Sequence, residues 1–406
     1  MKLNNRTLGI AFIGFALAFL LGEFSRVGDF NIFLMASEAL GEGKNIYTTT
    51  YVSGFHYYYS PLFAILITPL TWVSPYWAST LWNLFSFLLL ARVFIVLWKL
   101  FFPHSRQQPL IFLLGFAGCI FPVYSNFHMT QMSVFILWAM LECLYQVQVK
   151  ERHWLGGAIL GLALSIKIMP IVMLPYLLFR GHFKAAVYSI LTVAICVMLP
   201  VAFLGNDTSR ELTASWLELI NPAHKDHLLD LRERGFHSLT TLFAVLFSAE
   251  SYEEKFGVAR NLLSLDSQMV SVLINIVRLT LILSVLAIMR TKPFQKAQSA
   301  GHAFREVAYI CLITPLIFPH QQTYGFLLIL PAMLYLAYYF TMHWQLWKSE
   351  TWFKITFSLA LVSLLIINLE LILGEFRLWY WYYKTLTYGV LMLLGVLVVC
   401  KPRAIL

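Results

Sequence analysis

Apolar and polar residues alternate along this chain in long blocks. Apolar stretches of the length that crosses a bilayer, about 20 residues, recur from end to end with short polar gaps between them. The pattern predicts an all-α polytopic membrane protein with about 12 membrane helices, some of them short. The predicted spans lie at about residues 8–24, 76–99 and 109–123, a fourth ending at Lys150, two short helices within 154–180, then 185–204, 268–290, 306–319, 322–341, 352–372 and 379–400.

Two longer loops interrupt this series, at about residues 25–75 and 205–260. The first contains an apolar piece, Pro61–Trp72, that is too short to cross a membrane and is interrupted by Pro69. This piece is expected to form interfacial or re-entrant helices. No internal repeat, low-complexity tract or linker is evident, so residues 1–406 are expected to form a single membrane domain.

Composition supports the membrane interpretation. The chain is 59% hydrophobic and only 12% charged, with a mean hydropathy of +0.72, whereas soluble proteins carry about twice that charged fraction. The net charge of +9 does not indicate nucleic-acid binding, because the basic residues gather in the short gaps between spans. These residues are Lys2, Arg6, Lys99, Arg106, Lys150, Arg152, Arg180, Lys184, Arg290, Lys292, Lys296, Arg305, Lys348, Lys354, Lys401 and Arg403.

The positive-inside rule makes these gaps cytoplasmic and the two long loops extracytoplasmic. The apolar stretch 154–180 has basic residues at both flanks and is broken by Lys167 and Pro170. It is therefore expected to go up and come back as two short helices, with Lys167 near the outer turn. An anion-binding role fits a lysine there, and so does snorkelling of its ammonium to the headgroups.

Asp29 is the most informative polar residue, because it lies just beyond the first apolar stretch, Leu8–Gly22, at the mouth of a long aromatic loop. Ionisable residues at a bilayer boundary are functional candidates by default. A second interpretation is that Asp29 caps the helix suggested by Phe30–Leu40, since Asp is a favoured N-cap residue. The two roles are compatible.

Other polar groups are expected on the same outer face, which suggests an extracytoplasmic site built from distant segments. Each also has a structural interpretation: interhelical hydrogen bonding for the 126–131 segment, a plain loop for His320, and solvated charges for the arginines. The aromatic run 55–59 fits an interfacial belt or sugar stacking. The candidates are His128, Gln131, Arg232, Arg234, His237, Ser238, His320 and Tyr59.

Several other chemistries lack their signatures. The chain has no Walker-type loop, HExxH, GxSxG or CxxC motif. Its five cysteines lie in apolar segments without metal-type spacing: Cys119, Cys143, Cys196, Cys311 and Cys400. A nucleotide-driven pump is therefore disfavoured, and no metal site is expected from the sequence.

Several short segments together resemble glycosyltransferase family 87, a group of GT-C-type membrane enzymes. The resemblance begins at Asp29–Phe33 and continues through Tyr59–Phe63, with Phe33 and Ser60 standing where the family usually has tyrosine and proline. It extends over Thr130-Gln131, Gly161–Pro170, His237–Leu239 and Pro315–His320. His237 also departs from the family pattern, which often has asparagine and glutamine before the serine.

The resemblance implies transfer of a sugar, a hexose such as mannose or else arabinofuranose, from a polyprenyl-phosphate donor to a lipid or glycan acceptor. It further implies the bacterial cytoplasmic membrane, an extracytoplasmic site, no cofactor and no nucleic-acid partner, with divalent-metal dependence left open. Asp29 fits the general base. Lys167 fits the phosphate-binding cation, with His320, Arg232 and Arg234 assisting.

In the same scheme, Tyr59, His128, Gln131, His237 and Ser238 fit the substrate-binding residues. A single base without a second carboxylate implies inverting single displacement. The alternative class is a secondary transporter or lipid flippase, which also carries buried ionisable residues and broken helices. Such proteins typically contain repeated halves.

Overall fold

The computed structural model describes all residues except 1–4, 52–53, 103–107, 222–233, 249–255 and 403–406. The described part is helical and contains one isolated bridge, between Ser248 and Leu265, in place of a sheet. The chain forms two compact units, each built from more than one segment. The prediction of one domain over residues 1–406 stays a prediction.

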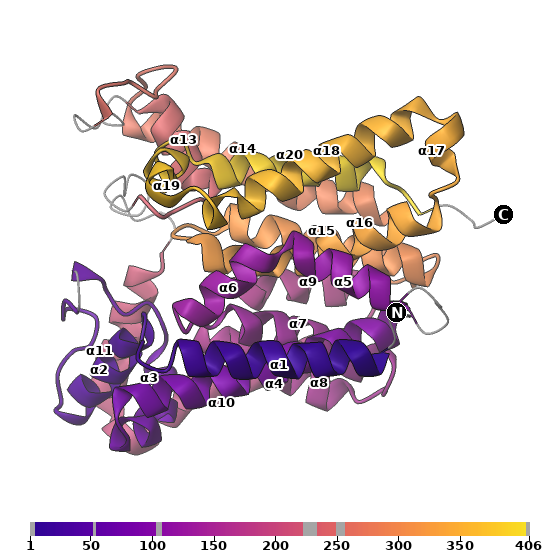
Figure 1. Cartoon of the computed structure of the whole chain (residues 1–406). Coiled ribbons are helices and arrows are strands. Elements are labelled where there is room, and N and C mark those ends of the chain that lie inside the picture. The colour runs from indigo at the N-terminus through magenta and orange to yellow at the C-terminus, as the bar shows by residue number, and fades with distance from the viewer. Residues whose placement is uncertain (1–4, 52–53, 103–107, 222–233, 249–255, 403–406) are drawn as a thin grey trace. The chain divides into compact units, whose positions relative to one another are not determined.

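The first unit comprises residues 1–104, 126–221 and 293–296. Within it α1 runs beside α4, and α4 packs on α7 (Figure 1). Its elements are α1 (Asn5–Gly22), α2 (Phe30–Gly41), α3 (Pro61–Ile67), η2 (Thr68–Trp72), α4 (Pro75–Phe101), α7 (Ser133–Gln148), α8 (His153–Ile166), η3 (Met169–Val172), α9 (Met173–Phe179), α10 (Phe183–Leu204) and α11 (Asn206–Leu219).

Small residues allow the closest helix packing in this unit. A Cβ atom at Gly157 would lie 2.6 Å from the Ala185 carbonyl oxygen, and one at Gly161 would lie 2.5 Å from the carbonyl oxygen of Ser189. Both glycines are on α8 and both neighbours are on α10, so the backbones of these two helices touch. Close backbone approach through small residues is the usual way in which membrane helices associate.

The second unit comprises residues 105–125, 222–292 and 297–406. Within it α18 packs on α20, and α15 lies between α14 and α16. Its elements are α5 (Gln108–Gly118), α13 (Leu239–Phe247), α14 (Ser267–Met289), α15 (Ala300–Ile317), η6 (Thr323–Ile329), α16 (Leu330–Met342), α17 (Leu346–Ser349), α18 (Thr351–Asn368), η7 (Leu369–Leu371), η8 (Gly374–Phe376), α19 (Arg377–Tyr382) and α20 (Thr385–Val399). Helix α6 (Ile120–His128) contributes residues to both units.

The helices support a polytopic membrane protein. Five described helices are long and apolar enough to cross a membrane, or up to seven if two bent pairs each count as one span. One bent pair is α5 with α6, at 65°, and the other joins Gly374–Tyr382 to α20, at 69°. The predicted spans 109–123 and 379–400 are therefore not straight helices. The count of about 12 stays a prediction, since several of the predicted spans are shorter apolar helices.

The stretch 154–180 is broken where the sequence predicted. Helix α8 ends at Ile166, Lys167 adopts an extended conformation, and η3 starts at Met169 with Pro170 in its first turn. Proline lacks the amide hydrogen that would bond to the Ile166 carbonyl oxygen and continue α8. This local break places Lys167 outside regular helix, with its backbone amide still bonded to Ala163.

Candidate functional site

Four residues from distant segments of the first unit form a continuous hydrogen-bonded chain. The Lys167 Nζ atom lies 3.3 Å from the Tyr59 hydroxyl. That hydroxyl lies 3.1 Å from Gln131 Oε1, and Gln131 Nε2 lies 2.7 Å from Asp29 Oδ2. The structure thus links the predicted base to the predicted phosphate-binding lysine through two of the predicted substrate-binding residues.

The direction of each bond follows from donor chemistry. An ammonium only donates, so the Tyr59 oxygen accepts from Lys167 and its own hydrogen points to Gln131 Oε1. The Gln131 amide must then turn its nitrogen to the carboxylate of Asp29. Every bond runs from the positive end to the negative end, and such chains polarise one another favourably. We call these four residues the relay.

The backbone around Asp29 is held against the Met129 backbone. The Asp29 amide donates to the Met129 carbonyl oxygen at 3.1 Å. Gly28 has φ +60, and a Cβ atom there would lie 2.8 Å from the carbonyl carbon and oxygen of Met129. Glycine is required here both for its backbone conformation and for this close approach.

Asp29 does not cap α2 through its side chain. It occupies the N-cap position, but its backbone is in the right-handed helical region and its side chain makes no capping hydrogen bond. A capping side chain normally belongs to a residue with extended backbone. The carboxylate is used instead by Gln131, so the interpretation of Asp29 as a side-chain cap is wrong.

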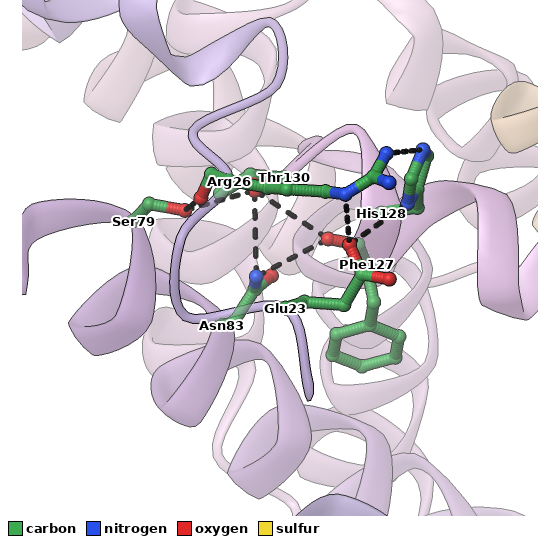
Figure 2. Close-up of polar contacts among 7 residues, drawn as sticks. All are labelled: Glu23, Arg26, Ser79, Asn83, Phe127, His128 and Thr130. Carbon is green, nitrogen blue, oxygen red and sulfur yellow. Dashed lines mark hydrogen bonds and ion pairs between the residues drawn. The ribbon is translucent and has the colours of Figure 1, made fainter. Parts of the chain in front are cut away.

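Gln131 follows an unusual residue, Thr130, which is buried and has φ +51. Figure 2 shows how the Thr130 hydroxyl is held, with Ser79 Oγ at 3.1 Å and Asn83 Nδ2 at 3.3 Å. Asn83 also donates to the Phe127 carbonyl oxygen at 3.2 Å. Ser79 and Asn83 are both on α4, so this helix holds Thr130 in a left-handed backbone conformation that non-glycine residues rarely adopt.

His128 belongs to a neighbouring polar group rather than to the relay. Its Nδ1 atom lies 3.0 Å from a Glu23 carboxylate oxygen, and its Nε2 atom lies 3.3 Å from Arg26 Nη1 (Figure 2). Arg26 in turn lies 3.4 Å from the same Glu23 oxygen. These contacts tie the end of α1 to the segment that carries Gln131, which resembles the predicted interhelical role.

Tyr59 and Lys167 are brought together by the segment that enters α3. Ser60 caps α3 by accepting from the Phe63 amide, and its own amide donates to the Ile166 carbonyl oxygen at 3.3 Å. Lys167 follows directly, with its Nζ atom 4.9 Å from the centre of the Tyr59 ring. The ammonium therefore gains both a hydrogen bond and a cation–π contact.

Burial shifts the pKa values of Tyr59 and Lys167. Desolvation raises the pKa of Tyr59, and the Asp29 carboxylate raises it further, so the phenol stays protonated. Lys167 lies in a helix break, outside the helices long enough to cross a membrane. Burial lowers its pKa to about 8, while the nearby Asp29 charge opposes the shift. Lys167 therefore remains mainly cationic at neutral pH.

The remaining described candidates lie in the second unit. The His237 amide donates to the Gln321 carbonyl oxygen at 2.7 Å, which joins the segment before α13 to the segment after His320. The His320 ring packs 4.8 Å from that of Phe236. Ser238 caps α13 by accepting from the Thr241 amide. Arg232 lies outside the described residues.

Lys384 is a residue of this second group that the sequence interpretation missed. It is buried, and its Nζ atom donates to the Arg234 carbonyl oxygen at 2.8 Å. Burial, and to a lesser degree the charge of Lys384, hold the pKa of His237 well below its usual range, so the imidazole is neutral. A lysine directly after the aromatic run 379–383 was the available signal.

Three further residues of the first unit were also missed: Glu23, Ser79 and Asn83. Ser79 and Asn83 are four residues apart in the apolar helix α4, and such spacing places both side chains on one helix face. Among the described residues, no three His, Cys, Asp or Glu side chains form a group that could hold a metal ion.

Comparison with known proteins identifies the family. The model of glycosyltransferase family 87 matches residues 57–315 of this chain. The chain belongs to this family. The match includes Tyr59, Gln131 and Lys167, and Asp29 precedes it.

Two curated relatives resemble parts of this family 87 chain. A polyprenol-phosphate-mannose-dependent alpha-(1-2)-phosphatidylinositol mannoside mannosyltransferase from Mycobacterium tuberculosis is 27% identical over 44% of this chain and 46% of its own length. The protein of the same description from Mycolicibacterium smegmatis is 25% identical over 49% of this chain and 48% of its own length. The similarity thus spans about half of each relative. No solved structure matches the chain significantly.

Proposed function

We propose that this chain is a glycosyltransferase that moves a mannosyl group from a polyprenyl-phosphate donor to a hydroxyl group of a lipid-linked acceptor. The family and the mannosyltransferase activity named for its two relatives support the donor and the sugar. The observation that carries the proposal is the relay, in which hydrogen bonds through Gln131 and Tyr59 connect the carboxylate of Asp29 to the ammonium of Lys167. These are the two charges that such a transfer requires.

The carboxylate of Asp29 is the general base of the proposed reaction. It takes the proton of the acceptor hydroxyl as that oxygen attacks the anomeric carbon of the sugar. Gln131 donates to Asp29 Oδ2 and so orients the carboxylate. Correct orientation of a base before reaction removes much of the entropic cost of proton transfer.

Lys167 is proposed to stabilise the leaving group, polyprenyl phosphate. As the new glycosidic bond forms, the bond between the anomeric carbon and the phosphate oxygen breaks, and polyprenyl phosphate leaves with an additional negative charge. An ammonium placed at that oxygen stabilises the charge. Because there is one base and no second carboxylate in the relay, the reaction is a single displacement with inversion at the anomeric carbon.

The active site is proposed to face the extracytoplasmic side. The positive-inside rule places the loop that contains Asp29 and Tyr59 on that side, and Lys167 is in contact with Tyr59. In this orientation the donor keeps its polyprenyl tail in the bilayer and presents its phosphate to the relay from the outer leaflet.

The deciding experiment is an assay of the purified full chain in proteoliposomes. It is supplied with radiolabelled polyprenyl-phosphate mannose and a lipid extract as acceptor source. Formation of a labelled glycolipid with a new mannosidic bond, identified by mass spectrometry, is the expected result. Transbilayer movement of the donor without bond formation would instead identify a transporter or flippase.

A further inference from the structure

Three cationic side chains surround the ring of Tyr145, near the C-terminal end of α4. The centre of the Tyr145 ring lies 5.0 Å from Arg92, 5.7 Å from Lys99 Nζ and 6.0 Å from Lys150 Nζ. Tyr145 itself is buried, whereas Lys99 and Lys150 are exposed. We call Arg92, Lys99, Lys150 and Tyr145 the basic cluster.

Among the described residues, a carboxylate balances one of the three charges of this cluster and leaves the other two unpaired. Glu142 pairs with Arg92 through two bonds, at 2.8 and 2.9 Å, and also accepts from Gln146 at 2.6 Å. That pair neutralises the guanidinium. Within the described residues, neither Lys99 nor Lys150 forms an ion pair, so two ammonium groups remain for an external anion.

The cluster is far from the relay. Helices α4 and α7 run in the same direction, because Asn83 contacts the segment before α7, whereas Arg92 contacts Glu142 within it. From Asn83 to Lys99 the rise along α4 is about 24 Å at 1.5 Å per residue. A hydrocarbon core is about 30 Å thick, so the relay and the cluster belong to opposite membrane boundaries.

The surface beside the cluster is suited to an acyl chain. Leu88, Arg92, Ile95 and Lys99 follow at intervals of four, three and four residues, which places them on one face of α4. On this face Leu88 is 64% exposed and Ile95 is 43% exposed. An apolar, uncovered strip thus leads along the helix to the ammonium of Lys99.

We propose that the basic cluster binds the phosphate group of an anionic phospholipid in the leaflet opposite to the active site. The phosphate lies between Lys99 and Lys150, and an acyl chain follows Leu88 and Ile95. A free phosphate ion offers the same charge but makes no use of the apolar strip. The site is separate from the proposed catalytic reaction and does not depend on it.

The test compares three forms of the full chain in detergent: wild type, Lys99→Gln/Lys150→Gln, and Lys348→Gln/Lys354→Gln. The control pair removes two charges as well, from exposed lysines at α17 and α18 that have no ring contact among those described. The probes are dioctanoyl phosphatidylglycerol, dioctanoyl phosphatidylcholine and inorganic phosphate. Binding is measured by native mass spectrometry and by the shift in thermal unfolding.

Wild type and the control pair are expected to bind phosphatidylglycerol with similar affinity. The Lys99/Lys150 variant should bind it roughly 30-fold more weakly, because each lysine at an anionic lipid surface contributes about a factor of five. Phosphatidylcholine and inorganic phosphate should bind wild type more weakly than phosphatidylglycerol. Equal loss in both double variants would reduce the effect to overall charge and overturn the proposal. Tighter binding of inorganic phosphate than of phosphatidylglycerol would overturn the lipid assignment.

Discussion

Gln131 donates a hydrogen bond of 2.7 Å to Asp29, although the two residues are 102 positions apart in the chain. The bond uses the carboxylate oxygen that an N-cap aspartate would turn to its own helix. It is the reason for treating Asp29 as a site residue, because capping does not account for its side chain.

Asp29→Asn should lower the rate of transfer by about 10²-fold or more, the scale of losing a general base. The asparagine can turn its oxygen to Gln131 and keep that hydrogen bond, so donor affinity and thermal stability should change little. Turnover and donor affinity are measured separately. Asp266→Asn is the matched control, since Asp266 is a side-chain cap of α14 and asparagine caps equally well. A normal rate for Asp29→Asn would remove Asp29 from the mechanism.

Tyr59→Phe should break the relay without removing a charge. The ring that faces Lys167 remains, but both hydrogen bonds of the hydroxyl are lost. A typical intramolecular hydrogen bond contributes about 1 kcal/mol, so kcat should fall roughly 5- to 10-fold as Gln131 loses its fixed orientation. Tyr51→Phe, which removes a hydroxyl that donates to the Ile46 carbonyl oxygen within the same loop, is the control. Equal kcat values for both variants would argue against the relay.

Lys167→Ala should weaken donor binding while the chain still folds. Hydrogen bonds to charged groups contribute about 1.5–3 kcal/mol, which corresponds to a loss of roughly 10- to 100-fold in donor affinity. Lys44→Ala is the control, because Lys44 is an exposed lysine of the first loop paired with Glu42. Donor affinity is measured by calorimetry with a short-chain polyprenyl-phosphate mannose. Unchanged affinity would leave Lys167 as a snorkelling residue.

Donor binding should also depend on pH through Lys167. Burial lowers the pKa of this ammonium to about 8, so its positive charge is lost as the pH rises through that value. The donor phosphodiester keeps its charge over the same range, and affinity should therefore fall between pH 7 and 9.5. Lys167→Arg should bind with little change over this range, because guanidinium stays protonated. The same pH profile in wild type and the arginine variant would assign the titration to another group.

Gly28→Ala should disturb the site through the backbone. A Cβ atom at Gly28 would lie 2.8 Å from Met129, whereas Gly43, also with positive φ, has no heavy atom within 4 Å of that position. Gly43→Ala should cost only the backbone strain, about 1–2 kcal/mol, and retain activity. Gly28→Ala should cost more and lower activity, because Asp29 is displaced from Gln131. Equal unfolding temperatures for the two variants would contradict the close approach.

Much of the helical architecture followed from the apolar pattern. Helix α4 covers the predicted span 76–99, and α14 covers the predicted span 268–290 up to Met289, because long apolar runs have few other stable forms in a membrane. The break at Lys167 also followed from the sequence, since Pro170 cannot continue a helix. Asp29 and Lys167 were evident as candidates because ionisable residues are rare in such a chain.

Other features had no local signal. The bends within 109–123 and 379–400 were not predicted, because a periodic apolar pattern is the same for straight and bent spans. The local sequence around Asp29 fitted a helix cap of α2 and a site residue equally well. The left-handed backbone of Thr130 depends on Ser79 and Asn83, which reach it from another helix.

The sequence alone was sufficient to predict a helical membrane protein of the family 87 type and to single out its candidate ionisable residues. These properties follow from composition, apolar run length and short motifs, all of which are local. The tertiary structure decided that Asp29, Gln131, Tyr59 and Lys167 share one hydrogen-bonded chain. It did so because hydrogen-bond partners far apart in sequence are chosen by helix packing, which no local pattern specifies.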